Sequence, residues 1–382
     1  MYVISILISK IIYFFINLLK IGSGFTWSGH LVLELFPKTL KRVSHRLPEK
    51  VVVVSGTNGK TTTVKLLRHI LETNGLKVLS NETGANLING VVSSVLLNSE
   101  INGSLDYDVA VFELDELNLS EFLKVVKPDV LALLNLSRDQ LDRYWEKEVI
   151  LEKWEEAVKG LNEDSLLVLD EDQRMLRKLS KLHKGSTRYF NDDRRYLKNT
   201  NLQGGYNAKN VNCSLLVAKG LGLDVEKAVG TLSNFKYAYG RGEKFEYKNK
   251  NFRVLLAKNP ESVNQNLSLL LEGVFSYDSV LYILNDNIPD GRDVSWIFDI
   301  EPELIKMVNQ KKHLYISGTR ALDMTVRIGY AGSEIDIRNV DSNLASTIEK
   351  IIKDENSKNI IVLPNYSAML DFREITLGRK IL

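Results

Sequence analysis

Short apolar runs alternate with longer helical stretches along most of the chain. The runs are rich in Val, Leu and Ile, and they predict strands at residues 51–54, 78–79, 109–112, 130–134 and 166–169. Between them the apolar residues recur at helical spacing, as in Val64, Leu67 and Leu71. Strands separated by helices indicate βαβ units, and therefore a parallel sheet.

The pattern changes after the fifth of these strands. Residues 171–203 are polar, rich in Lys and Arg, and without a long apolar period, so we expect a surface excursion there. Helices are predicted next, at 207–221 and 225–235, and residues 238–243 look like a hinge. Further strands are predicted at 252–256, 280–284, 313–316 and 360–363, which indicates a second α/β domain of about 140 residues.

The most informative motif directly follows the predicted strand at residues 51–54. The segment Ser55-Gly56-Thr57-Asn58-Gly59-Lys60-Thr61-Thr62 leads from a strand into a helix. Backbone N–H groups of such a turn can surround a polyphosphate, Lys60 supplies a positive charge, and the Thr61 hydroxyl can bind Mg²⁺. The segment departs from the usual G-x-x-x-x-G-K-[ST] pattern, because Val54 stands where the first glycine is expected. It nevertheless predicts a binding site for ATP and Mg²⁺ formed by Gly56, Thr57, Asn58, Gly59, Lys60, Thr61 and Thr62.

Polar residues stand at the ends of the strands that follow. Glu113, Asn135 and Asp170 each come at a carboxyl end, on the same edge of the sheet as the phosphate loop. A carboxylate in that position typically anchors the magnesium ion, so we assign Glu113 to this role together with Thr61. We expect Asp115 and Glu116 to form a solvated acidic turn.

The N-terminal segment is strongly apolar. Residues 1–19 carry Lys10 at their centre, and a lysine at mid-bilayer costs roughly 2.5–3.5 kcal/mol. Three interpretations are open: a helix packed on the domain, a helix in the plane of a membrane, or a single span. We favour the first two. Ser5, Ser9 and Asn17 give the segment a modest polar side, which suits peripheral membrane contact.

Composition and charge narrow the function classes. The 382 residues carry a net charge of +2 and no basic block with interleaved aromatic residues, so nothing supports nucleic-acid binding. The only cysteine, Cys213, excludes a disulfide framework and a multi-cysteine zinc site, and we expect no zinc. Cys213 lies in a predicted helix without a strand-to-helix turn, so we interpret it as a buried small hydrophobe rather than a nucleophile.

Several motifs together carry a family resemblance. The phosphate loop resembles that of the Mur ligase superfamily, and Asp139-Gln140-Leu141-Asp142-Arg143 resembles the MurT family, the ligase subunit of lipid II isoglutaminyl synthase. The second domain adds Asp286-Asn287, Asp290-Gly291-Arg292-Asp293-Val294-Ser295-Trp296, Ser317-Gly318-Thr319-Arg320 and Asn365-Tyr366-Ser367. The resemblance covers nearly the whole chain.

The resemblance implies a fold and a set of residues. The fold is α/β: an N-terminal helix and connector (1–38), a Mur-ligase-type ATP-binding domain with a parallel-sheet core (39–242), and a smaller Rossmann-like C-terminal domain (243–382). Asn210, Arg241 and Asn264 would help to bind the nucleotide, with Asn264 also toward the acceptor. Lys60, Glu113 and Asp323 would be catalytic, and Asp323 would face the active site of a partner. A plain helix N-cap is the alternative role for Asp323.

The resemblance also implies a reaction and partners. ATP would activate the α-carboxylate of D-glutamate in the lipid II stem peptide as an acyl phosphate, and ammonia would convert it into D-isoglutamine. A separate GatD-like glutaminase would supply the ammonia, and the chain would act in the cytoplasm at the inner face of the cell membrane. Members of this family commonly carry a four-cysteine zinc ribbon, and residues 171–203 resemble its shortened remnant.

Two other functions stay open. One is an amino-acid ligase of the Mur or folylpolyglutamate type, which dependence on glutamine and a partner would distinguish. The other is a membrane-associated P-loop ATPase without ligase chemistry, which would release phosphate with no carboxylate acceptor.

Overall fold

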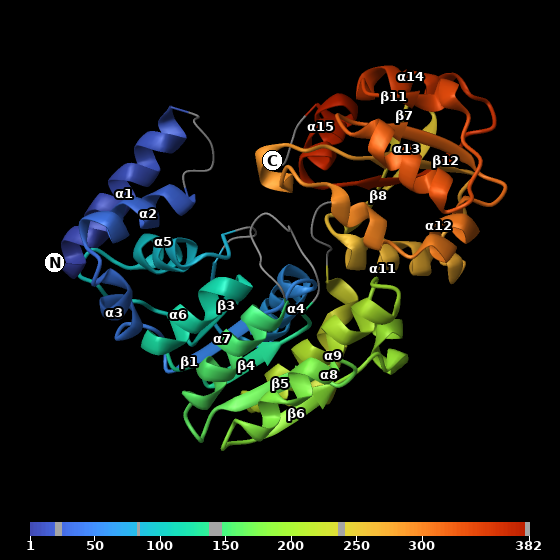
Figure 1. Cartoon of the computed structure of the whole chain (residues 1–382). Coiled ribbons are helices and arrows are strands. Elements are labelled where there is room, and N and C mark those ends of the chain that lie inside the picture. The colour runs from blue at the N-terminus through green and yellow to red at the C-terminus, as the bar shows by residue number, and fades with distance from the viewer. Residues whose placement is uncertain (20–24, 82–84, 137–146, 236–240, 379–382) are drawn as a thin grey trace. The chain divides into compact units, whose positions relative to one another are not determined.

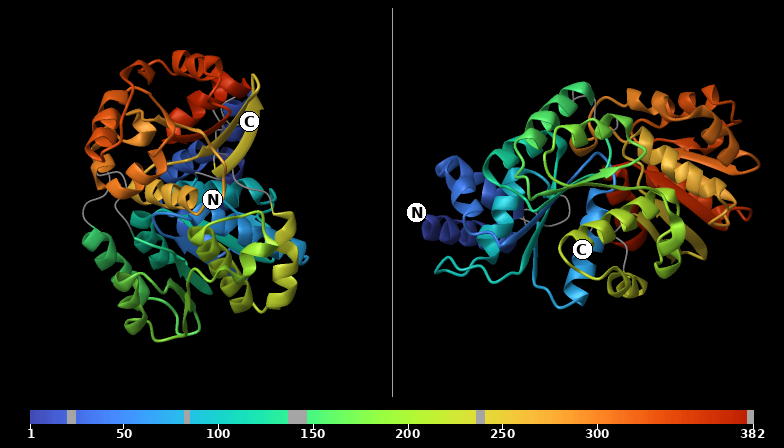
Figure 2. Two further views of the ribbon diagram at one scale, coloured as in Figure 1. Left: turned by 90° about the vertical axis from the view of Figure 1, so that its right-hand side faces the viewer. Right: turned by 90° about the horizontal axis from the view of Figure 1, so that it is seen from below.

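The computed structural model describes residues 1–19, 25–81, 85–136, 147–235 and 241–378 (Figure 1). These residues form two compact units. Unit 1 comprises the described residues up to Phe235 apart from Lys147, and unit 2 comprises Lys147 and the described residues from Arg241 onward. Each unit is built on its own β-sheet, as the further views in Figure 2 also show.

Unit 1 contains a six-stranded parallel sheet with the order β2-β3-β1-β4-β5-β6. Its strands are β1 (Lys50–Ser55), β2 (Val78–Ser80), β3 (Val109–Leu114), β4 (Val130–Leu133), β5 (Leu166–Asp170) and β6 (Thr187–Phe190). Its helices are α1 (Tyr2–Leu18), α2 (Phe25–Leu35), α3 (Thr39–Ser44), α4 (Lys60–Thr73), α5 (Ile88–Asn98), α6 (Glu116–Val125), α7 (Lys147–Lys159), α8 (Arg174–Arg177), α9 (Gly205–Gly220) and α10 (Val225–Thr231). The predicted parallel α/β core is confirmed.

The four central strands of this sheet are buried on both faces. On one face Val52 and Val54 join the core formed with α4 and α9. On the other face Phe112 of β3 contacts Phe122 of α6, with ring centroids 6.1 Å apart. Burial on both faces explains why these strands appear in the sequence as unbroken apolar runs rather than as alternating patterns.

Two expectations for unit 1 are wrong. The connector expected after the N-terminal helix and up to residue 38 is not plain chain, because α2 occupies Phe25–Leu35. Residues 171–203 are not merely a surface excursion, because β6 pairs with β5 at the edge of the sheet. Only Phe190 of β6 is buried, and a half-exposed edge strand of four residues leaves little hydrophobic signal in the sequence.

Helix α1 packs against α2 and α5 of unit 1. The Tyr2 hydroxyl lies 3.0 Å from Ser99 Oγ, and Lys10 Nζ donates to the Leu97 carbonyl at 3.0 Å. Within the described part of the chain, no helix has both the length and the apolar character needed to cross a membrane.

Unit 2 contains a six-stranded mixed sheet with the order β11-β10-β9-β12-β8-β7, in which β7 alone runs antiparallel to its neighbour. Its strands are β7 (Arg241–Tyr247), β8 (Lys250–Leu255), β9 (Ser279–Ile283), β10 (His313–Ser317), β11 (Val340–Asp341) and β12 (Asn359–Pro364). Its helices are α11 (Pro260–Leu271), α12 (Pro302–Asn309), α13 (Ala321–Tyr330), α14 (Leu344–Lys353) and α15 (Tyr366–Leu377).

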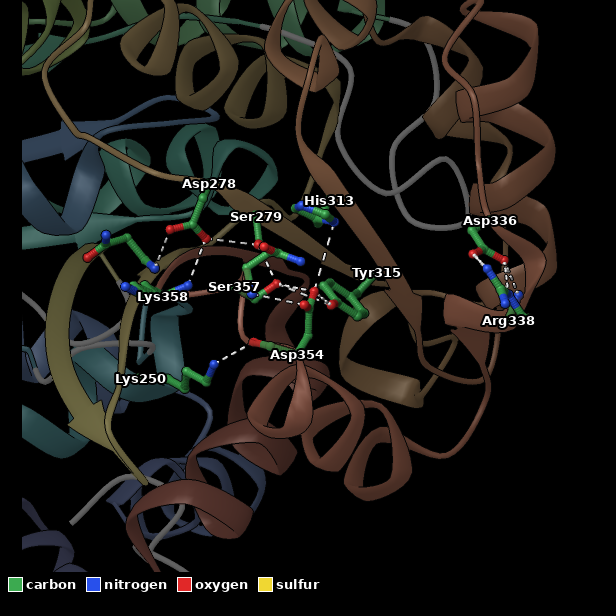
Figure 3. A network of polar contacts seen from close by, with 12 residues as sticks. Lys250, Asp278, Ser279, His313, Tyr315, Asp336, Arg338, Asp354, Ser357 and Lys358 are labelled. Atoms are coloured by element: carbon green, nitrogen blue, oxygen red, sulfur yellow. Dashed lines mark hydrogen bonds and ion pairs between the residues drawn. The ribbon is translucent and has the colours of Figure 1, made fainter.

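A polar network fixes the amino ends of the central strands of unit 2 (Figure 3). The Asp278 carboxylate accepts the backbone N–H groups of Lys358 and Asn359, each at 2.9 Å, at the start of β12. The Tyr315 hydroxyl donates to Asp354 Oδ2 at 2.6 Å. Ligands of open α/β sheets bind at the opposite, carboxyl ends, so we interpret this network as structural.

Candidate nucleotide and magnesium site

The loop between β1 and α4 is shaped by two glycines. Gly56 has φ 137° and Gly59 has φ 88°, both in the region that favours glycine. A Cβ on Gly56 would lie 2.9 Å from the Asn135 backbone nitrogen, and one on Gly59 would lie 2.4 Å from Asn210 Oδ1. Both positions therefore need glycine for two reasons, the backbone conformation and the close approach of a neighbour.

The same loop is fixed by Asn135, which follows β4. Asn135 Oδ1 accepts the Asn58 N–H at 2.8 Å, and its Nδ2 donates to the Asn58 carbonyl at 2.9 Å. Its own carbonyl accepts the Thr57 N–H at 3.0 Å. Asn135 thus fixes the conformation of the loop through its side chain and its backbone carbonyl.

Lys60 begins α4, and its ammonium lies in the interior of unit 1. It donates to the carbonyls of Gly56 and Thr57, the latter at 3.3 Å, and it lies 3.1 Å from Glu116 Oε2. The side chains of Lys60 and Glu116 are 8% and 4% exposed. This ion pair places a positive charge directly beneath the loop.

The expectation of a solvated acidic turn after Glu113 is therefore wrong. Asp115 and Glu116 are both buried. Asp115 caps α6 by accepting the Leu117 N–H at 3.1 Å, and Glu116 pairs with Lys60. Lys60 and Glu116 are 56 residues apart, so the spacing within either segment gave no signal for this pairing.

Thr61 and Glu113 meet as predicted. Thr61 Oγ1 donates to Glu113 Oε1 at 3.1 Å, and Glu113 is 5% exposed. Asn81, which follows β2, holds Glu113 in place by bonding both its backbone N–H and its carbonyl, at 2.9 and 2.8 Å. A hydroxyl and a carboxylate side by side next to a phosphate loop fit the oxygen ligands that Mg²⁺ takes, with phosphate oxygens and water completing the set.

Helix α9 brings Asn210 against the same loop. Thr63 Oγ1 lies 3.3 Å from Asn210 Oδ1, and that oxygen is also the atom that Gly59 approaches. The predicted residues Thr57, Asn58, Thr61 and Thr62 are all buried here. The residues predicted for nucleotide binding in the first domain are thus brought together around one loop.

The third predicted strand end, Asp170, carries a separate ion-pair cluster. Lys209 Nζ lies 3.0 Å from Asp170 Oδ2 and 2.7 Å from Asp172 Oδ2. Burial raises the pKa of the Asp170 carboxyl. For Lys209 burial acts against the charged form, but the hydrogen bond to Asp172 and the charge of Asp170 raise its pKa. Since Lys209 precedes Asn210 in α9, this cluster fixes that helix to β5.

The remaining predicted residues belong to unit 2. Asn264 lies in α11, where its Oδ1 accepts the Glu301 N–H at 2.9 Å. Asp323 is not the N-cap of α13, since Arg320 holds that position. Asp323 lies in the first turn and forms a two-bond ion pair with Arg320, at 2.8 and 3.0 Å. Arg241 begins β7, and its side chain lies outside the described atoms, as do Gln140 and the rest of the Asp139–Arg143 motif.

Unit 2 has a polar cluster of its own at the carboxyl edge of its sheet. Asn285 follows β9 and donates to Ser367 Oγ at 3.2 Å and to Asp371 Oδ2 at 3.1 Å. The Ser367 N–H and hydroxyl donate to Asp290, whose pKa is raised by burial. The motifs around Asp290 and Ser367 therefore meet at one place, although they are 77 residues apart in sequence. The 317–320 motif joins them, because the Thr319 N–H donates to Asn285 Oδ1 at 3.1 Å.

Comparison with known proteins places this arrangement in a family. Residues 54–215 match the Mur ligase middle domain, and residues 256–369 match the MurT ligase C-terminal domain. The chain belongs to the MurT family of the Mur ligase superfamily. It is 25% identical to the lipid II isoglutaminyl synthase (glutamine-hydrolyzing) subunit MurT of Staphylococcus aureus strain N315, over 91% of each chain. It is 26% identical to the subunit of that name from Streptococcus pneumoniae strain R6, over 95% of this chain and 94% of that one.

Solved structures share the fold at lower identity. MurF from Acinetobacter baumannii superimposes with a TM-score of 0.68 and 17% identity, over 88% of this chain and 77% of that one. A bifunctional folylpolyglutamate synthase/dihydrofolate synthase solved with Mn, AMPPNP and L-glutamate gives 0.62 and 15%, over 88% and 93%. The Mur ligase fold predicted from the sequence is confirmed.

The cysteine of this MurT-family chain is not placed for catalysis. Cys213 lies within α9, and none of its surface is exposed. Burial raises the pKa of its thiol, so the reactive thiolate is disfavoured. The interpretation of Cys213 as a buried hydrophobe is confirmed.

Proposed function

We propose that this chain is the ATP-dependent synthetase subunit of a lipid II isoglutaminyl synthase. The observation that carries the proposal is the contact between Thr61 and Glu113 beside a lysine-bearing phosphate loop, in a chain of the MurT family. The loop would bind the phosphates of ATP through its N–H groups and Lys60, and Thr61 and Glu113 would hold Mg²⁺. The metal, when bound, neutralises charge on the transferred phosphoryl group.

The proposed reaction has two steps. An oxygen of the D-glutamate α-carboxylate attacks the γ-phosphorus of ATP, which forms an acyl phosphate and releases ADP. Ammonia then attacks the acyl carbon, phosphate leaves with the C–O bond electrons, and one proton is lost to give the amide of D-isoglutamine. Stabilising the developing negative charge is the main task of the protein, and we propose that Lys60 contributes to it. We propose that Asn264 and Asp323 of unit 2 face the acceptor side, and that Asn210 of unit 1 and Arg241 of unit 2 contact the nucleotide.

A second polypeptide would supply the ammonia. The S. aureus and S. pneumoniae relatives are named as the MurT subunit of a glutamine-hydrolysing enzyme. Because the thiol of Cys213 is buried in α9, this chain lacks an exposed cysteine nucleophile of its own. We propose a GatD-like glutaminase as the partner, with Asp323 directed toward its active site, and a cytoplasmic location at the inner face of the membrane, where a lipid-linked acceptor resides.

The test is a reaction of the purified chain with ATP, Mg²⁺, ammonium chloride and lipid II. We expect ADP to form together with a stem peptide that has gained one amide in place of one carboxylate, as seen by mass spectrometry. Glutamine should replace ammonium only after the glutaminase is added. A product heavier by one amino-acid residue would favour the amino-acid ligase. Phosphate release that does not depend on lipid II would favour the ATPase without ligase chemistry.

A further inference from the structure

Helix α1 presents an uncovered apolar face. Residues spaced three and four apart along it are between 40% and 63% exposed; we call them the α1 face, and they are Val3, Ile4, Leu7, Ile11, Phe14, Phe15 and Leu18. On the neighbouring helix α2, Trp27 and Leu35 are 57% and 62% exposed. A contiguous apolar strip of this length on one helix marks an interaction surface.

The polar side of α1 is turned toward the protein. Ser5 and Ser9 are fully buried, although the sequence led us to expect a polar side available to water. Tyr2 and Lys10 bond to Ser99 and to the Leu97 carbonyl, and the Arg46 guanidinium lies 5.6 Å from the centre of the Tyr2 ring. These contacts fix the rotation of the helix about its axis. The α1 face is therefore held outward by the fold.

The net charge of residues 1–50 indicates what kind of partner covers the α1 face. Residues 1–50 hold seven lysines and arginines and two glutamates, a net charge of +5 in a chain whose total is +2. The first acidic residue is Glu34. Lys38 precedes α3 and Lys41 lies within it, and both are exposed. Apolar residues together with excess basic charge are the combination by which a helix binds in the plane of an anionic lipid surface.

We propose that the α1 face lies in the headgroup region of an anionic phospholipid bilayer, parallel to the membrane plane, with the exposed residues Lys38 and Lys41 contacting the lipid phosphates. Lys10 does not have to enter the hydrocarbon, because its ammonium is bonded to α5 on the opposite side of the helix. This proposal rests on the proposed function in one respect: a lipid-linked acceptor would explain why a ligase needs to bind a membrane. The binding itself requires neither acceptor nor ATP.

The experiment is co-sedimentation of the full chain with vesicles of phosphatidylcholine alone or mixed with phosphatidylglycerol. We expect binding to the mixed vesicles that weakens at high salt. The variant Ile11→Ser/Phe14→Ser/Leu18→Ser should bind at least about tenfold more weakly. Lys38→Gln/Lys41→Gln should lose about fivefold for each lysine that reaches the lipid surface. The matched control Ile101→Ser/Met307→Ser/Ile337→Ser removes equally exposed apolar residues elsewhere and should bind normally.

Three readouts keep the outcomes separate. Circular dichroism and ATP affinity should be unchanged in all three variants, because the α1 face contributes to neither the core nor the phosphate loop. Equal binding by the wild type and the α1 variant would overturn the proposal. So would a concentration-dependent dimer, or a complex with the glutaminase, that the α1 variant abolishes while vesicle binding is absent, since the face would then be a protein interface. Vesicle binding without lipid II amidation would retain this proposal and reject the proposed function.

Discussion

The ammonium of Lys60 lies 3.1 Å from the carboxylate of Glu116, and both side chains are almost completely buried. Glu116 is the first residue of α6, and its carbonyl accepts the Trp154 indole N–H at 3.0 Å. The lysine of the phosphate loop is therefore positioned by a carboxylate from a neighbouring strand–helix connection, which is in turn fixed by α7. A phosphate that binds to the loop therefore meets a Lys60 ammonium that is already paired with the Glu116 carboxylate.

The first prediction concerns this pair. Glu116→Gln should lower the free energy of unfolding of unit 1 by about 2–4 kcal/mol, because it leaves the Lys60 charge buried without its counter-charge. Lys60→Ala should cost stability as well, and should reduce ATP turnover by several powers of ten. The double variant should be less destabilised than the sum of the two, as measured by urea unfolding. Additive effects would show that the two charges are not coupled.

Magnesium dependence tests Glu113. Glu113→Gln keeps the shape of the side chain and its bond from Thr61, but it removes a charged metal ligand. We expect a much higher magnesium concentration for half-maximal ATP turnover, with partial rescue as magnesium is raised. Glu121→Gln, an exposed glutamate of α6, is the control. An unchanged magnesium requirement for Glu113→Gln would remove this residue from the site.

Gly59→Ala should weaken ATP binding at least tenfold. The positive φ costs a non-glycine residue about 1–2 kcal/mol, and the new methyl group would also displace Asn210. Gly75→Ala is a matched control, since Gly75 has φ 89° with no atom within 4 Å of its Cβ position and lies outside the loop. It should lose similar backbone stability and keep ATP affinity. Calorimetric titration with ADP or a non-hydrolysable ATP analogue measures the nucleotide affinity of both variants.

The native thiol should be inert. Because Cys213 is fully buried and its pKa is raised by burial, maleimide should react only after denaturant is added. Cys213→Ala should retain glutamine-dependent activity when the glutaminase is present. Rapid labelling of the folded protein, together with loss of that activity, would contradict a two-subunit enzyme.

A pH-dependent prediction follows from Tyr315 and Asp354. Burial acts to raise the pKa of Asp354, but hydrogen bonds from Tyr315, the Asn356 N–H and Ser357 lower it below its ordinary value. A lowered folded-state pKa stabilises the protein above about pH 4, and this contribution is lost as the pH falls through the folded value. Tyr315→Phe should cost about 1–3 kcal/mol at neutral pH, and less as Asp354 becomes protonated.

The control for this variant is Tyr277→Phe, which removes a hydroxyl that donates to the Val308 carbonyl at 3.1 Å. A carbonyl does not titrate, so the loss of unfolding free energy caused by Tyr277→Phe should not vary over the same pH range. Urea unfolding from neutral to acidic pH compares the two. Parallel curves for both variants would show that Tyr315 does not act through the Asp354 carboxylate.

Much of the fold was predictable, because buried parallel strands leave a strong signal. The run Val51–Val54 could only be a core strand, and its neighbours along the chain repeat the pattern. The strands that were missed are at the edges of the sheets. β6, β7 and β11 keep one side exposed or are very short, so they show neither a continuous apolar run nor a long alternation.

The site was predictable wherever the chemistry is local in sequence. The phosphate loop and the end of β3 each contain their own signal, and the register that sets Val54 opposite Glu113 brings them together. Glu116 was missed because burial of a carboxylate depends on what lies across from it. Neither the ion pair with Lys60 nor the hydrogen bond from Trp154 can be recognised from the spacing of residues within one segment.

The short edge strand β6 has a consequence for self-association. Open strand edges invite other chains to extend the sheet, and proteins discourage this by keeping such strands short and placing charge on them. β6 spans four residues, and Arg188 and Tyr189 are exposed on it. The sheet of unit 1 therefore ends on this side with a strand that is short and carries an exposed charge at Arg188, which disfavours edge-to-edge pairing between copies of the chain.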